Sequence, residues 1–237
     1  NLACPTQQTV FNNTSTILSG TISSWAWSFP GATPPGSTAQ NPTTTYSSGG
    51  NYVVTLTATS DSGCVDSVSQ QIVIPYTPLA NFSATTVCVG GQTCFTDLSN
   101  VQNGNITGWQ WVFGDGSPVD NAQNPCHTYA NAGVYNVTLL VTSNDGCASS
   151  HQLQVTVHSL PIAAFSTNDV CNNIAAIFND QSQNVASYNW NFGDGNTSTS
   201  QNPSHFYVNP GTYSVKLVVT SAGGCLDSIT KQITIYP

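Results

Sequence analysis

Residues 109–116 read Trp-Gln-Trp-Val-Phe-Gly-Asp-Gly, and residues 188–195 read Tyr-Asn-Trp-Asn-Phe-Gly-Asp-Gly. In both stretches aromatic side chains alternate with other residues, so the three aromatics fall on one face of an extended strand. Gly-Asp-Gly is a turn signal, because glycine tolerates a positive φ and aspartate hydrogen-bonds to nearby backbone. Each stretch therefore predicts a β-strand with a buried aromatic face that ends in a tight turn.

The pattern occurs a third time near the N-terminus, where residues 25–29 read Trp-Ala-Trp-Ser-Phe and Pro-Gly-Ala replaces Gly-Asp-Gly. Other features recur with the same period of about 80 residues, which suits a small domain with its own core. They are the pairs Asn41-Pro42, Asn124-Pro125 and Asn202-Pro203, the tyrosines Tyr52, Tyr135 and Tyr213, and the cysteines Cys64, Cys147 and Cys225. We therefore divide the chain into three units, residues 1–76, 77–159 and 160–237.

Strand patterns fill the rest of each unit. After Tyr52, Tyr135 and Tyr213, apolar residues alternate with polar ones, and another alternating stretch ends each unit. Glycine-containing turns separate these stretches. Short alternating strands with frequent turns are typical of antiparallel sandwiches. The predicted fold class is all-β, with one sandwich in each unit.

Charged residues are scarce. The 237 residues include Lys+Arg 2 and Asp+Glu 10, for a net charge of -8. Two basic residues cannot neutralise a phosphate backbone or hold an anionic membrane surface, and no apolar run reaches the ~20 residues of a spanning helix. We expect no nucleic-acid partner and no membrane insertion. Eight cysteines without paired C-x-x-C spacing indicate disulfides and an extracellular location.

The links between the units are short and contain proline, at Pro75 to Pro78 and at Pro161. Proline favours an extended chain, so we expect a string of units with little interface. The sequence contains no methionine, and we expect it to be part of a longer protein, with more units on at least one side. Units 2 and 3 share an opening that unit 1 lacks, namely Ala80-Asn81-Phe82 and Ala163-Ala164-Phe165. Unit 1 is therefore interpreted as incomplete at its N-terminus.

Units 2 and 3 contain a distinctive order of motifs, Trp-x-Phe-Gly-Asp-Gly, then Asn-Pro, then Tyr, then Gly-x-Tyr-x-Val. This order resembles the PKD domain, an immunoglobulin-like β-sandwich, and the resemblance covers essentially the full chain in three tandem copies. The extra cysteines make the chain similar to the PKD repeats of large bacterial cell-surface adhesins. The motif residues are Trp111, Phe113, Asn124, Pro125, Tyr129, Gly133 and Tyr135, and Trp190, Phe192, Asn202, Pro203, Tyr207, Gly211 and Tyr213.

The resemblance implies a non-catalytic segment of a long secreted or cell-surface protein that serves as a stalk, filament or adhesin. Its partners would be further repeats of the same chain, like chains in a filament, or a surface glycan or protein. The alternative is a polysaccharide- or protein-binding accessory module of a secreted hydrolase. The sequence has no Gly-x-Ser-x-Gly elbow and no glutamate, and we predict that it is not an enzyme and uses no cofactor.

The Gly-Asp-Gly motifs are interpreted as structural turns rather than phosphate cradles, because no helix pattern and no lysine accompany them. The histidines His127 and His205 occupy equivalent positions and are expected to pack or hydrogen-bond. No metal site is predicted. Calcium at Asp97 and Asp180 stays an alternative because some PKD relatives bind calcium, but unit 1 has Asn13 at this position, so the site would be incomplete in one copy of three. The turn residues are Gly114, Asp115, Gly116, Gly193, Asp194 and Gly195.

The aromatic triplets could form either the core or a sugar-stacking platform. They share the face of the strand that the alternation assigns to the core, so we favour burial. Trp25, Trp109 and Tyr188 stand at the strand starts and are expected to be partly exposed.

The cysteines also follow the repeat. Each unit has one cysteine seven residues before a phenylalanine and one cysteine twelve residues after its strand tyrosine. We predict that these two pair within each unit, and that the two remaining cysteines pair within unit 2. The predicted disulfides are Cys4–Cys64, Cys88–Cys147, Cys171–Cys225 and Cys94–Cys126.

Two serines are candidates for O-glycosylation. Ser67 and Ser228 lie in Asp-Ser-Val and Asp-Ser-Ile, which resemble a bacterial O-glycosylation signal. Their parity is opposite to that of the apolar residues of the last strand, so they should face solvent. Unit 2 has Ser150 at this place without the aspartate, and serves as an internal control. The alternative is that the aspartates only cap the hairpin turn.

Overall fold

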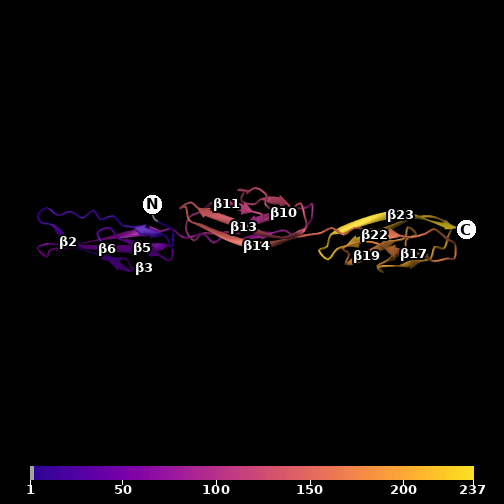
Figure 1. Cartoon of the computed structure of the whole chain (residues 1–237), viewed down its shortest axis with the longest axis horizontal. Helices are drawn as coiled ribbons and strands as arrows, with labels where there is room; N and C mark the ends of the chain where they lie inside the picture. Colours follow the sequence, from indigo (N-terminus) through magenta and orange to yellow (C-terminus); the bar gives the residue numbers. More distant parts are fainter. Residues whose placement is uncertain (1–2) are drawn as a thin grey trace.

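Three β-sandwich units lie in a row in the computed structural model, which describes residues 3–237 (Figure 1). The described elements are all β-strands, which confirms the predicted fold class. None of the residues 3–237 belongs to a helix that is long and apolar enough to cross a membrane. The first two residues of the predicted unit 1–76 lie outside the described residues.

Unit 1 contains seven strands in two sheets. The strands are β1 (Gln8–Val10), β2 (Ile22–Ser28), β3 (Ala32–Thr33), β4 (Gly36–Ser37), β5 (Thr43–Tyr46), β6 (Gly50–Ser60) and β7 (Val65–Ile74). One sheet has the order β1-β5-β3 and the other has the order β4-β2-β6-β7. The aromatic residues of β2 face the first sheet, where Phe29, just beyond the strand, is fully buried and Trp27 is half-buried.

Unit 2 repeats this arrangement with a complete first sheet. Its strands are β8 (Phe82–Ala84), β9 (Val87–Cys88), β10 (Gln92–Asp97), β11 (Ile106–Val112), β12 (Cys126–Thr128), β13 (Gly133–Ser143) and β14 (Ala148–His158). The sheets have the orders β12-β10-β8 and β11-β13-β14-β9. The short strand β9 pairs in parallel with the end of β14, with Cys88 opposite His158. Trp111 and Phe113 are buried between the sheets, as the alternation predicts.

Unit 3 has the same plan with shorter pieces in its first sheet. Its strands are β15 (Phe165–Ser166), β16 (Val170–Cys171), β17 (Ala176–Ile177), β18 (Asn179–Asp180), β19 (Ser187–Asn191), β20 (Thr197–Ser198), β21 (Ser204–His205), β22 (Gly211–Thr220) and β23 (Leu226–Tyr236). The five-stranded sheet has the order β16-β23-β22-β19-β20, and β15-β18 and β17-β21 face it. The strand β16 pairs with the end of β23, with Cys171 opposite Tyr236.

The units touch each other over little surface. The chain exposes 13101 Å². A single compact protein of its mass would expose roughly 10,200 Å², and three separate domains of one third of that mass would expose about 13,700 Å². The exposed area is close to the second value, so little surface is buried at the two junctions. The expected extended string is confirmed (Figure 1).

Candidate functional site

Disulfide bonds join neighbouring units. Cys4 of unit 1 is bonded to Cys147 of unit 2, and Cys88 of unit 2 is bonded to Cys225 of unit 3. The Cα atoms are 5.6 Å and 5.8 Å apart. In both bridges the first cysteine of one unit meets the late cysteine of the next. The predicted bridges within units are therefore wrong, namely Cys4–Cys64, Cys88–Cys147 and Cys171–Cys225.

The length of the last strand explains why the two cysteines of one unit do not pair with each other. Cys88 lies beside His158 at the end of β14, whereas Cys147 directly precedes the first residue of that strand. Eleven residues of extended strand separate the two ends by ~36 Å, at ~3.3 Å per residue. A disulfide needs Cα atoms about 4.4–6.8 Å apart. The two cysteines of one unit therefore lie at opposite ends of it, and only a neighbouring unit brings a partner within reach.

The remaining cysteines behave in two ways. Cys94 and Cys126 lie opposite each other on β10 and β12 and form the predicted bridge within unit 2, which is confirmed. Cys64 and Cys171 are free and exposed. The pairing between units was missed because spacing along the sequence does not show at which end of a sandwich a residue lies. The strand length was the signal that could have found it.

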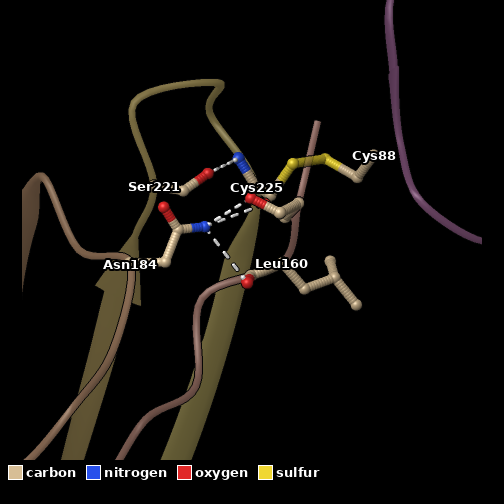
Figure 2. The surroundings of a disulfide bond; sticks show 6 residues. Cys88, Leu160, Asn184, Ser221 and Cys225 are labelled. Atoms are coloured by element: carbon tan, nitrogen blue, oxygen red, sulfur yellow. Dashed lines mark hydrogen bonds between the residues drawn. A yellow bond between two sulfur atoms is a disulfide. The ribbon is translucent and has the colours of Figure 1, made fainter. Parts of the chain in front are cut away.

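The junction between units 2 and 3 has polar contacts beside its bridge (Figure 2). The side-chain amide of Asn184 donates to Oγ of Ser159 over 2.7 Å and to the carbonyl oxygen of Leu160 over 3.2 Å. The backbone N–H of Cys225 donates to Oγ of Ser221 over 3.2 Å (Figure 2). Gly223, in the same turn, lies so close to His158 that a Cβ atom would collide with its ring. The turn that carries the late cysteine is thus fitted against the end of the preceding unit.

The Gly-Asp-Gly motifs form tight turns, as predicted. Gly114 and Gly116 have φ values of 83° and 84°, and the Oδ1 atom of Asp115 accepts the N–H of Ser117 over 3.0 Å. Unit 3 is the same. Gly193 and Gly195 have φ values of 86° and 96°, and Asp194 accepts the N–H of Asn196 over 3.0 Å.

A histidine closes each of these turns. Nε2 of His127 lies 2.7 Å from Oδ2 of Asp115, and its ring stacks on Phe113 with centroids 4.2 Å apart. Burial acts to raise the pKa of Asp115, but hydrogen bonds from Ser117 and His127 outweigh it and lower this pKa to about 2. His205 and Asp194 repeat the pair at 2.7 Å. The histidines therefore pack and hydrogen-bond, as expected.

The calcium candidates Asp97 and Asp180 are engaged in hydrogen bonds. Oδ2 of Asp97 accepts Nε1–H of Trp109 over 2.7 Å, and Oδ2 of Asp180 accepts the side-chain amide of Gln201 over 3.0 Å. Within residues 3–237 there is no cluster of three His, Cys, Asp or Glu side chains that could hold a metal. Calcium would have to compete with these hydrogen bonds for the carboxylate oxygens. Binding of calcium at Asp97 and Asp180 stays a proposal.

The other predicted surface residues lie as follows. Trp25, Trp109 and Tyr188 are partly exposed, as expected. Ser67 and Ser228 are exposed, and the preceding aspartates accept their N–H groups over 2.8 Å. The aspartates thus have a local capping role, and glycosylation of the two serines stays a prediction.

The chain is similar to parts of known proteins. A region of 51 residues, or 22% of this chain and 5% of the relative, is 47% identical to collagenase ColA of Bacillus cereus. A region of 56 residues, or 24% of this chain and 6% of the relative, is 48% identical to the pre-pro-metalloprotease PrtV of Vibrio cholerae. The chain thus matches only a small part of these curated relatives. Three N-terminal domains of the Hoc capsid protein of bacteriophage RB49 share the fold, with a TM-score of 0.50 and 12% identity over 99% of this chain and 95% of that chain.

The family model for the PKD domain matches three times, over residues 1–74, 76–157 and 159–236. These matches cover almost the whole sequence, and each contains one of the three buried core clusters. The chain therefore belongs to the PKD domain family and consists of three such domains in succession.

Proposed function

We propose that the chain is a non-catalytic spacer of a longer extracellular protein, which holds other parts of that protein at a fixed distance and carries tension. Three consecutive PKD domains supply reach, and the low charge and the absence of a predicted catalytic constellation fit a structural role. The small shares of the collagenase and the metalloprotease that match this chain fit a module within a larger secreted protein. Location at the cell surface is part of the same proposal.

The observation that carries this proposal is the covalent bond across each junction. The units bury little surface against each other, so the linker alone would act as a hinge. Cys4–Cys147 and Cys88–Cys225 add a second covalent connection at each junction. Two connections restrict both bending and rotation about the linker. A string of small domains thereby becomes a rod of defined length.

The bridges also limit how far the chain can be stretched. The shortest covalent route between the two ends runs along residues 1–4, 88–94, 126–147 and 225–237, and crosses all three disulfides. This route contains roughly 46 residues and reaches ~170 Å when fully extended, whereas the reduced chain would reach ~850 Å at ~3.6 Å per residue. Even complete unfolding under force could therefore not extend the oxidised chain beyond ~170 Å.

Single-molecule pulling on the full chain tests the spacer function. We expect an end-to-end length that does not exceed ~170 Å under oxidising conditions, and a limit about fivefold larger with a reductant. Replacing both Cys94 and Cys126 by serine is a matched control, which should add the length of about 31 residues only. A reductant-independent length of several hundred ångströms would contradict the proposal.

The second candidate function is that of an accessory module that binds the substrate of a secreted hydrolase. The similarity to ColA and PrtV favours it, since both are named as proteases. Sedimentation of the full chain with fibrillar collagen and with insoluble polysaccharides tests this candidate. Saturable binding to one of them would favour it over the spacer, and recovery of the chain in the supernatant would exclude these ligands.

A further inference from the structure

Unit 1 has an open apolar groove on its outer end. The groove has a volume of about 520 Å³ and adjoins a second hollow of about 250 Å³. Leu56 and Val68 line both hollows, and the side chain of Val68 is 63% exposed. Apolar side chains that gather in an open groove favour an occupant that covers them.

In units 2 and 3 the Ala-x-Phe opening covers the equivalent surface. Phe82 lies 5.0 Å from the ring of Trp111, and Phe165 lies 5.0 Å from the ring of Trp190. Trp111 and Trp190 are fully buried, whereas the equivalent Trp27 is only half-buried. The core cluster of unit 1 has 5 buried residues, against 11 in unit 2 and 12 in unit 3. The groove thus marks the missing part of a core.

The backbone beside the groove has an unpaired edge to which a further strand can be hydrogen-bonded. Ile162, in the opening of unit 3, exchanges two backbone hydrogen bonds of 3.0 Å and 2.9 Å with Gln183. Leu79 of unit 2 makes the same exchange with Asn100. The equivalent residue of unit 1 is Thr16, whose backbone has no backbone partner among residues 3–237. An unpaired edge of this kind is the usual site for the addition of an extended segment.

Unit 1 also has the polar side chains that bind the Ala-x-Phe segment in units 2 and 3. In unit 3, Oγ of Ser182 accepts the N–H of Ala164 and donates to its carbonyl oxygen, both over 3.0 Å. The carboxylate of Asp227 accepts the N–H of Ala163 over 2.8 Å. Unit 2 makes the same contacts through two serines. The equivalent residues of unit 1 are Ser15 and Asp66, and both line the groove.

The free cysteine of unit 1 lies at the same place. Cys64 lines the groove and is exposed. Its equivalents in units 2 and 3 are 1% exposed, and each is bonded to the first cysteine of the preceding unit. Cys171 is the first cysteine of unit 3 and is also free. The two free cysteines are therefore the complementary halves of the bridge that occurs at both junctions.

We propose that unit 1 is an acceptor for a further PKD-like unit. An Ala-x-Phe segment that trails from that unit occupies the groove as an added β-strand, and the first cysteine of that unit forms a disulfide with Cys64. Cys171 offers the same kind of bond to the late cysteine of a unit on the other side. A second copy of this chain does not fill the groove, because its two Ala-x-Phe segments are buried in their own units. The proposal is independent of whether the rod carries tension.

Formation of the bridge requires an oxidant. The two thiols lose two protons and two electrons to a low-molecular-weight disulfide such as glutathione disulfide, and a sulfur–sulfur bond forms between them. The oxidant is reduced to two thiols, so that atoms and electrons balance.

Competition between two tethered peptides tests the groove. The full chain with Cys171→Ser would be equilibrated with glutathione-capped peptides that contain Cys-Gly-Gly followed by residues 160–167, either unchanged or with Phe165→Asp. Cys64 displaces glutathione from each, and the tether supplies a high local concentration. Because the unchanged peptide buries Phe165 in the groove, we expect its adduct with Cys64 to exceed the adduct of the Phe165→Asp peptide at least ~10-fold. Equal amounts of the two adducts would overturn the proposal.

A groove variant shows whether the preference arises at the proposed place. Val68→Asp changes an exposed side chain and should leave the fold intact, which near-ultraviolet circular dichroism verifies. We expect the peptide preference to fall to about one in this folded variant. A preference that persists would place the peptide elsewhere and contradict the proposal.

Selective pairing of the two free cysteines tests the bridge. Full chains with Cys64→Ser and with Cys171→Ser would be mixed and oxidised with glutathione disulfide. We expect a heterodimer with a Cys171–Cys64 bond in the peptide map, and little dimer from either variant alone. Homodimers at statistical abundance, or no heterodimer at all, would contradict the assigned pairing, while the peptide competition decides the groove separately.

Discussion

Among single residues, the pair of Asp115 and His127 makes the stability of unit 2 depend on pH. Hydrogen bonds from Ser117 and His127 hold the folded-state pKa of Asp115 near 2, against ~3.9 in an unfolded chain. A lowered pKa contributes stability that is present above about pH 4 and is lost as the pH falls through 2. We expect up to about 2 kcal/mol from this group, reduced by its partial exposure.

Urea unfolding of unit 2 between pH 5 and pH 2 tests this effect. Asp115→Asn should flatten the pH dependence of the unfolding free energy in this window. Asp120→Asn is a matched control, since Asp120 caps only the N–H of Ala122 and does not meet the histidine. An unchanged pH dependence in Asp115→Asn would contradict the assigned role.

O-glycosylation is predicted at Ser67 and Ser228. Both hydroxyl groups are exposed, and both follow an aspartate in the short motif. Ser150 is equally exposed at the same place in unit 2 but lacks the aspartate. We expect glycopeptide mass spectrometry of natively purified protein to find sugar on Ser67 and Ser228 and none on Ser150. Unmodified Ser67 and Ser228 would end this prediction.

At the scale of elements, the turn after β11 depends on two glycines to different extents. A Cβ atom on Gly114 would lie 2.5 Å from the carbonyl oxygen of Asn136, whereas a Cβ on Gly116 would meet open space. Both residues have a positive φ. Gly116→Ala should therefore cost about 1 kcal/mol of unfolding free energy from backbone strain alone, and Gly114→Ala about 3 kcal/mol or more. Equal urea midpoints for the two variants would contradict the close approach.

The elements themselves could largely be predicted from the sequence, because alternation reports which side of a strand is buried. Trp111 and Trp190 are in the core for this reason. The partial exposure of Trp27 could not be predicted in the same way, since alternation does not show that residues 3–76 lack a counterpart of Phe82 and Phe165, which contact Trp111 and Trp190. The disulfides show the same limit. Cys94 and Cys126 face each other across two paired strands, whereas the other bonded cysteines depend on which ends of neighbouring units meet.

At the scale of the whole molecule, the bridges across the junctions should control its shape in solution. Small-angle scattering of the oxidised chain should give the maximum dimension of three domains in a row. Reduction and alkylation leave the linkers as hinges, so the average radius of gyration should fall and the distance distribution should broaden. Replacing Cys94 and Cys126 by serine should change neither quantity. An identical scattering profile after reduction would show that the linkers alone keep the rod straight.

The two large disulfide rings overlap, and this affects proteolytic cleavage. One ring closes residues 4–147 and the other closes residues 88–225, so every peptide bond from residue 4 to residue 225 lies in at least one ring. Hydrolysis of any one of these bonds opens a ring but releases no fragment. Lys216 lies inside a ring and Lys231 lies outside both, and the sequence contains no other lysine or arginine. A trypsin-like protease could therefore detach only the residues after Lys231, and the nicked remainder would stay a single covalent body until a reductant reached it.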